Sequence, residues 1–116
     1  MDERLQKALE FSNYTLTLNN QKRNIKNRVA QLQLVHYNSG VFVADHATIS
    51  FFKTLVDMKK DKNIVVMDSK ENPVKVVDLN ELLDKLVNAY FSAMNEYESE
   101  NEKLRKARSI KQIMDW

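Results

Sequence analysis

Two histidines are the first candidates for metal or acid–base chemistry. His36 and His46 are the only histidines among the 116 residues, and Asp45 directly precedes the second. Imidazole and carboxylate groups bind zinc, but zinc sites place their ligands at short and characteristic spacings. Ten residues and the only glycine, Gly40, separate the two histidines, and no third ligand follows at such a spacing. We therefore expect solvated or capping histidines and no metal.

Carboxylates are the second candidates. Asp68 and Asp78 flank a segment rich in turn-forming residues, where Asp usually accepts backbone hydrogen bonds. The glutamates of residues 96–102 alternate around a helix and do not converge as paired catalytic carboxylates do. The chain has no cysteine for thiolate chemistry, and a single glycine is too few for a phosphate-binding loop. The sequence thus predicts a non-enzymatic protein without catalytic residues or cofactors.

Two basic clusters are candidate contacts for nucleic acid, because phosphate binding needs no particular motif. The net charge of only +2 gives little electrostatic attraction to nucleic acid. No aromatic residues interleave with the basic ones to stack bases, and the acidic residues 96–102 are expected to neutralise the first cluster. Nucleic-acid binding therefore remains the alternative function. The basic candidates are Lys22, Arg23, Lys26 and Arg28 in the first cluster and Lys103, Arg105, Lys106 and Arg108 in the second.

Composition favours one small domain, 1–116, that is mostly helix. Hydrophobic residues make up 43% and charged residues 29%, as in an ordinary folded protein, and the chain has one glycine and one proline. No apolar run is long enough to span a membrane, and the opening Met1-Asp2-Glu3-Arg4 does not resemble a signal peptide. We therefore expect no membrane partner and a cytoplasmic location.

The two ends of the chain are expected to form long helices, over residues 1–36 and 79–108, with residues 109–116 as a tail. The first helix carries apolar residues every seven positions, at Phe11, Leu18, Ile25 and Leu32. The second carries a heptad seam at spacings of four and three, formed by Leu83, Val87, Tyr90, Met94, Tyr97, Asn101 and Leu104. An antiparallel pairing is favoured because it sets the acidic residues 96–102 beside Lys22, Arg23 and Lys26, and the basic residues 103–111 beside the acidic start.

The middle of the chain, 37–78, is expected to form a small αβ head. Gly40 is expected to end the first helix with a positive φ. A short strand over 41–43 precedes a helix over about 46–59 that Asp45 caps. Residues 64–67 and 74–77 flank a turn and predict a β-hairpin, with 41–43 pairing alongside. Since 64–67 is apolar throughout, both its faces are expected to be covered. The predicted fold class is α+β, helix-dominated, in the order α-β-α-β-β-α.

A surface for a protein partner, or for self-association, is predicted from amphipathic and apolar residues of the last helix. Tyr90, Met94 and Tyr97 either contact a partner or pack on Tyr14 and Leu18 of the first helix. The apolar stripe at the C-terminus either folds back on Leu5 and Leu9 or anchors a partner. That stripe consists of Ile110, Ile113, Met114 and Trp116.

Several stretches resemble the small open reading frames of T-even-like tailed bacteriophages, especially those that infect marine cyanobacteria. These are Phe11-Ser12-Asn13-Tyr14, residues 18–23 (LNNQKR), residues 37–44 (YNSGVFVA) and the basic residues 103–110. The resemblance implies a structural, assembly or host-directed role in the virion or the host cytoplasm, and it transfers no functional residue. The leading hypothesis is a non-enzymatic, phage-encoded interaction protein that acts through helical surfaces.

Overall fold

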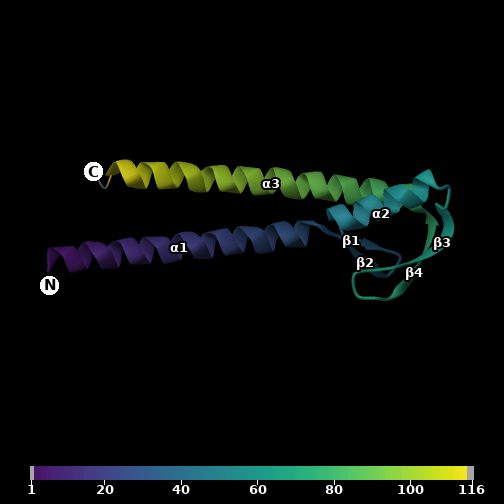
Figure 1. The fold of residues 1–116 in the computed structure, drawn as a ribbon, viewed down its shortest axis with the longest axis horizontal. Helices are drawn as coiled ribbons and strands as arrows, with labels where there is room; N and C mark the ends of the chain where they lie inside the picture. The colour runs from purple at the N-terminus through teal and green to yellow at the C-terminus, as the bar shows by residue number, and fades with distance from the viewer. Residues whose placement is uncertain (1, 115–116) are drawn as a thin grey trace.

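The chain forms a rod that carries a small head at one end, as a computed structural model shows (Figure 1). The structure describes the backbone of residues 2–114 and the side chains of residues 2–106. The overall dimensions are 70 × 24 × 18 Å. The rod consists of α1 (Glu3–Leu32) and α3 (Leu79–Met114), which run antiparallel. The head contains β1 (Leu34–Tyr37), β2 (Gly40–Val43), α2 (His46–Asp57), β3 (Lys62–Met67) and β4 (Pro73–Asp78).

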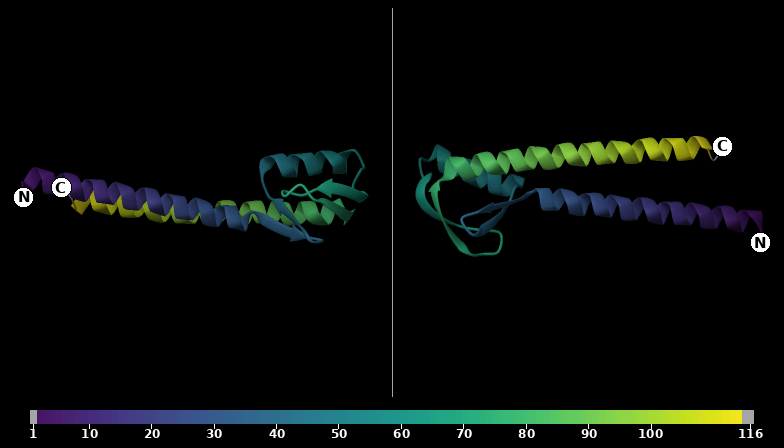
Figure 2. Two further views of the ribbon diagram at one scale, coloured as in Figure 1. Left: turned by 90° about the horizontal axis from the view of Figure 1, so that it is seen from below. Right: turned by 180° about the vertical axis from the view of Figure 1, so that it is seen from behind.

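The predicted fold class is confirmed: a helix-dominated α+β fold with long terminal helices around a small αβ segment. The element order has one strand more than predicted, α-β-β-α-β-β-α, because residues 34–37 form a strand and not the end of the first helix. Figure 2 (left) shows α1 and α3 in one layer, with α2 set off from that layer in the head. Only Gln33 separates α1 from β1, and no residue separates β4 from α3.

Two antiparallel hairpins make up the strands of the head. β1 pairs with β2, and β3 pairs with β4. The strand over 41–43 was expected beside the second hairpin, and that prediction is wrong. Val35 supplies the reason: as a β1 residue it pairs with Phe42 of β2 and is buried in the core at 9% exposure, which a longer helix would not permit.

Gly40 has another role than the one predicted, since its φ is not positive. The two-residue turn between β1 and β2 is made by Asn38 and Ser39, with φ values of 46° and 67°, the arrangement that suits a tight hairpin. Gly40 is instead confined by its neighbours. A Cβ added there would lie 2.5 Å from Cγ2 of Val74. The absence of a side chain lets the two hairpins approach each other.

Two clusters of buried residues hold the fold together. The larger cluster, in the head, joins both hairpins, α2 and the start of α3, and its largest fully buried side chains are Phe42, Val76, Leu79, Leu82 and Leu86. The smaller cluster lies between the rod helices, where Ile25, Val29 and Ala93 are buried. Residues 3–24 of α1 include no buried side chain. The apolar contact between the rod helices is therefore concentrated near the head, and Figure 1 shows the helices drawing apart toward their free ends.

The boundaries of α2 and the start of α3 follow the predicted signals closely, whereas α1 ends earlier and α3 later than predicted. Asp45 caps α2, because its Oδ1 accepts a hydrogen bond from the Thr48 amide at 2.8 Å, which confirms the predicted N-cap. α2 ends at Asp57, two residues before the predicted end, and α3 starts at Leu79 as predicted. α3 continues to Met114, so its backbone includes most of the segment treated as a tail.

Candidate functional site

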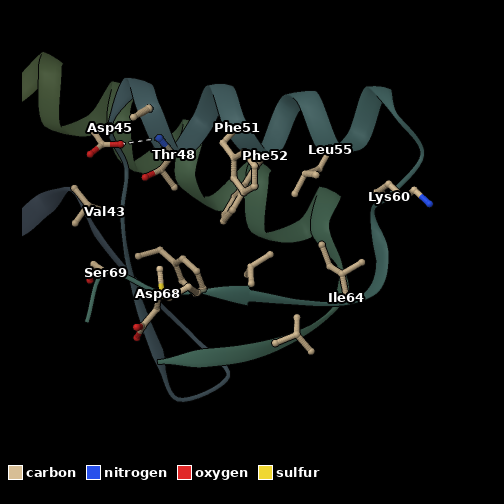
Figure 3. A pocket seen from close by; sticks show the side chains of 15 residues that line it. Val43, Asp45, Thr48, Phe51, Phe52, Leu55, Lys60, Ile64, Asp68 and Ser69 are labelled. Carbon is tan, nitrogen blue, oxygen red and sulfur yellow. Dashed lines mark hydrogen bonds between the residues drawn. The ribbon is translucent and has the colours of Figure 1, made fainter. Parts of the chain in front are cut away.

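An apolar groove lies in the head between α2 and β3 (Figure 3). Its volume is about 740 Å³, within the range of sites that bind small ligands or peptide side chains. Its walls come from α2, from β3 and from the end of β2. Most of the lining side chains are apolar, and charged groups stand only near its ends. The groove is thus a concave and mainly apolar surface of the head.

Helix α2 forms one wall of the groove. Phe52 is 2% exposed and meets Phe42 edge to face, with 5.9 Å between the ring centroids. Phe52 and Leu55 point from α2 toward β3 (Figure 3). Phe51, whose ring centroid is 5.9 Å from that of Phe52, remains 56% exposed. The α2 wall thus combines the buried ring of Phe52 with the solvent-exposed ring of Phe51.

Strand β3 forms the opposite wall and has one free edge. Val66 pairs with Val74, and the amide of Asp68 donates to the carbonyl of Asn72 at 2.9 Å. Residues that bond across an antiparallel ladder alternate with residues that do not, so Val65 and Met67 direct their N–H and C=O groups away from β4. Pro73, which lacks an N–H, stands opposite Met67, where no cross-strand bond is required.

That free edge is open to a partner. Within residues 2–106, no hydrogen bond reaches the outward main-chain groups of Val65 or Met67. The side chains of these two residues are also 60% and 65% exposed. The expectation that both faces of 64–67 would be covered is therefore wrong within this chain. The inner face is covered by the core, whereas the outer face and the edge are not.

Asp68 fastens the end of β3 to β2. Its carboxylate accepts hydrogen bonds from the amides of Val41 (3.0 Å), Lys70 (3.0 Å) and Asn72 (2.8 Å). The Val41 carbonyl in turn accepts bonds from the amide (2.9 Å) and the hydroxyl (2.7 Å) of Ser69. These bonds, first that from Val41 and then that from Asn72, lower the pKa of Asp68. The predicted turn role of Asp68 is confirmed, and its added contact holds together one end of the groove.

Opposite charges stand at the two ends of the groove. Asp45 lies at the end where α2 begins, and Lys60 lies at the other end (Figure 3). Thr48 uses one carboxylate oxygen of Asp45. In the described part of the chain, neither Asp45 nor Lys60 belongs to an ion pair. The groove is therefore negatively charged at the Asp45 end and positively charged at the Lys60 end.

The predicted partner-binding residues do not form one surface. Tyr90 is half-buried in the head, where its hydroxyl lies 3.1 Å from Nε2 of His46. Met94 and Tyr97 pack on the buried pair Ile25 and Val29, so the expected packing of these residues on Tyr14 and Leu18 is wrong in register. The side chains of Ile110, Ile113 and Met114, and all of Trp116, lie outside the described residues.

The basic clusters are partly neutralised within the rod. Arg28 pairs with Glu96 and Glu100, each at 3.6 Å. The acidic block therefore faces the first cluster as predicted, but through Arg28 and not through Lys22, Arg23 or Lys26. In the second cluster Lys103 pairs with Glu100 (3.2 Å) and Arg105 with Glu102 (3.3 Å). The side chains of Lys22, Arg23, Lys26 and Lys106 are exposed, and that of Arg108 lies outside the described residues.

Comparisons with known proteins give no relative for this chain. No protein-family model matches it, and no curated protein or solved structure was found to match. Among the described residues, no three or more His, Cys, Asp or Glu side chains gather as a metal site would require. No described helix combines the length and apolar character that crossing a membrane requires.

Sequence reasoning missed the groove. The apolar run 64–67 was expected to be covered on both faces, and no exposed residue of the α2 segment was singled out as a site residue. The available signal was the excess of apolar residues in these two segments over what a domain this small can cover. The position of the groove depends on how α2 packs against the second hairpin, which no local pattern encodes.

Proposed function

We propose that this chain is a non-enzymatic protein-interaction protein that acts through the helical surfaces of its rod, first with a second copy of itself. The resemblance to small phage proteins supports a structural, assembly or host-directed accessory role as its setting. The observation that carries the proposal is that the first half of α1 has apolar residues on two opposite faces. Only one of these faces is directed toward α3.

The outer face of α1 forms what we call the leucine stripe, Leu5, Leu9 and Leu16. At 3.6 residues per turn these side chains fall within about 40° of one another, roughly opposite Ile25, which packs toward α3. Their exposed fractions are 53%, 47% and 59%. A helix that is apolar on two sides is typical of one packed between two neighbours. Its own chain supplies one of those neighbours.

An antiparallel pairing of two α1 helices places the leucine stripes against each other. Asp2 lies just before the stripe, and Arg23 lies beyond its other end on the same face. Antiparallel packing therefore brings Asp2 of one copy toward Arg23 of the other at both ends. The isologous contact closes on itself and leaves the two heads at opposite ends of the dimer.

Sedimentation equilibrium over a range of protein concentrations tests this proposal. We expect wild-type protein to dimerise and Leu9→Lys to sediment as a monomer, because a charge at the centre of the contact has no partner. Gln6→Lys is the matched control, since it adds the same charge about 80° away from the centre of the stripe. Circular dichroism checks that all three proteins are equally helical. A monomeric wild type, or a Leu9→Lys dimer as strong as the wild type, refutes the proposal.

Nucleic-acid binding remains the alternative, and exposed Lys22 and Lys26 are what favour it. The ion pairs of Arg28, Lys103 and Arg105 leave fewer free cations for phosphate. A salt titration of DNA or RNA binding separates the two functions. Steep salt dependence that Lys22→Glu with Lys26→Glu removes would favour the alternative, and weak binding that both proteins share would favour the interaction protein.

A further inference from the structure

We infer that the groove between α2 and β3 binds an extended peptide segment of a partner protein, which adds to the free edge of β3 as an antiparallel strand. This site lies in the head and does not depend on the leucine stripe of the rod. The partner chemistry is a run of alternating apolar and polar residues, with a basic residue at its N-terminal end and an acidic residue at its C-terminal end.

The main chain of β3 supports an extended occupant over a helical one. Val65 and Met67 turn two N–H and two C=O groups toward the free edge, and no hydrogen bond among residues 2–106 satisfies them. A helix brings no free main-chain groups along its length, whereas a strand offers donors and acceptors at the spacing that such an edge requires. Val41 makes one main-chain bond of this kind inside the chain, since its carbonyl accepts a hydrogen bond from the Ser69 amide just beyond the end of β3.

The side chains of the groove supply the selectivity. Successive side chains of an added strand alternate between its two faces. Residues opposite Ile64 and Val66 would face inward, toward Leu55 and the exposed ring of Phe51. Residues opposite Val65 and Met67 would face solvent. Apolar side chains are therefore favoured at the peptide positions that face inward, which are every second position. They are less favoured at the intervening positions, which face solvent.

The charges at the ends select the direction. β3 runs from the Lys60 end of the groove toward the end where Asp45 lies. An antiparallel strand therefore begins near Asp45 and ends near Lys60. Neither Asp45 nor Lys60 belongs to an ion pair within the described chain. Asp45 is therefore available to a basic first residue of the peptide, and Lys60 to an acidic last residue. A parallel strand of the same sequence would place like charges together at both ends.

Fluorescence anisotropy with the full chain and a panel of labelled heptapeptides tests the inference. The panel has the pattern Lys-X-Ser-X-Ser-X-Glu, where X is Val, Leu or Phe, with blocked termini. We expect at least one member to bind. A version with the apolar residues moved next to one another, and a version with Lys and Glu exchanged, should each bind about tenfold more weakly. If no member binds at about 1 mM, the inference is wrong.

N-methylation distinguishes strand addition from simple apolar contact. In the proposed register the Ser residues donate their N–H groups to β3, and the X residues direct theirs to solvent. Methylating the two Ser amides should weaken binding by about tenfold or more, while methylating two X amides should change it little. Equal effects at both sets would overturn strand addition.

Protein variants locate the site. Phe51→Ser should lower the affinity about tenfold, whereas Phe91→Ser, at an equally exposed aromatic position (59%) on α3, should leave it unchanged. Val65→Pro removes an outward N–H without breaking the bonds to β4, so it should weaken the peptide while the hairpin persists. Leu9→Lys should not alter peptide binding, which separates this test from that of the rod. Binding that survives both Phe51→Ser and Val65→Pro would place the peptide elsewhere and refute the site.

Discussion

Replacement of Gly40 by alanine should destabilise the fold although it adds only one methyl group. The new Cβ would lie 2.5 Å from Cγ2 of Val74, far inside the 3.4–4 Å of ordinary van der Waals contact. Val74 is 5% exposed and β-branched, so its side chain has little freedom to turn away. Overpacking of this kind costs about 1–3 kcal/mol. We therefore expect Gly40→Ala to lower the free energy of unfolding by about 2 kcal/mol.

A double-mutant cycle tests whether this contact is the cause. Val74→Ala alone removes two buried methyl groups and should cost about 2 kcal/mol. In that background the clash with Cγ2 disappears, the 3.3 Å approaches to Cε2 of Phe42 and to the carbonyl oxygen of Tyr37 remain, and the alanine at position 40 restricts the unfolded chain. Gly40→Ala should then cost nothing or stabilise the protein by up to about 1 kcal/mol. The expected coupling between the two positions is therefore about 2–3 kcal/mol.

Urea unfolding followed by circular dichroism measures these energies, provided that all four proteins are compared at one concentration. If Gly40→Ala costs the same in both backgrounds, the energy does not come from the contact with Val74. If Gly40→Ala is neutral in the wild type, the close approach of the two hairpins at this point is wrong.

Four further predictions concern stability. Leu86→Ala should cost about 3–5 kcal/mol in urea unfolding, because Leu86 is fully buried in the head. Glu71→Gly should stabilise the protein by about 1 kcal/mol and raise its melting temperature, since Glu71 has a φ of 64°, which glycine adopts without strain. Arg28→Ala should cost less than about 1 kcal/mol, and less still at high salt, because its ion pairs are exposed. Acid should destabilise the fold through Asp68 and Asp78. The pKa of Asp68 is lowered first by the Val41 amide and that of Asp78 first by the Lys62 side chain. Both lie below the unfolded value of 3.8, so the unfolded chain binds more protons near that pH. Their stabilisation is present above 3.8 and lost as the pH falls through the folded values, and Asp68→Asn should flatten this part of a pH titration of stability.

The sequence was sufficient for the features that short-range patterns encode. The long terminal helices follow from heptad spacing, the N-cap at Asp45 from its position before an apolar helix, and the hairpin turn from Asp68 and its neighbours. Each of these depends on residues a few positions apart, and the structure confirms each one. The antiparallel direction of the helices followed from the position of the charges.

The register of the rod could not be predicted, because a heptad pattern looks the same after a shift of seven residues. Met94 and Tyr97 were matched with Leu18, whereas they pack on Ile25, one heptad further along the same stripe. The charges do not correct this error, since basic residues occur throughout 22–28 and an exposed pair contributes too little energy to decide the register. The contacts of the head, which bury more residues, set it instead.

The first strand was missed for a related reason. Nothing between Leu32 and Leu34 breaks a helix, and the strand conformation of β1 depends on its pairing with β2, whose residues lie three to nine positions later. Tertiary pairing overrides local preference here. The groove of the head, in turn, lies between α2 and β3, and their relative position exists only in the assembled core.

The short connections between rod and head couple movements of the rod helices to movements of the hairpins. α1 passes into the first hairpin through Gln33 alone, and β4 passes into α3 with no residue between them. Each rod helix is thus joined directly to a different hairpin, α1 to β1–β2 and α3 to β3–β4. The two hairpins contact each other at Val41, which bonds to Asp68 and Ser69. A force that slides or separates the free ends of α1 and α3 meets no flexible linker that could absorb the movement. Such a force is therefore transmitted to the contact between the two hairpins at Val41.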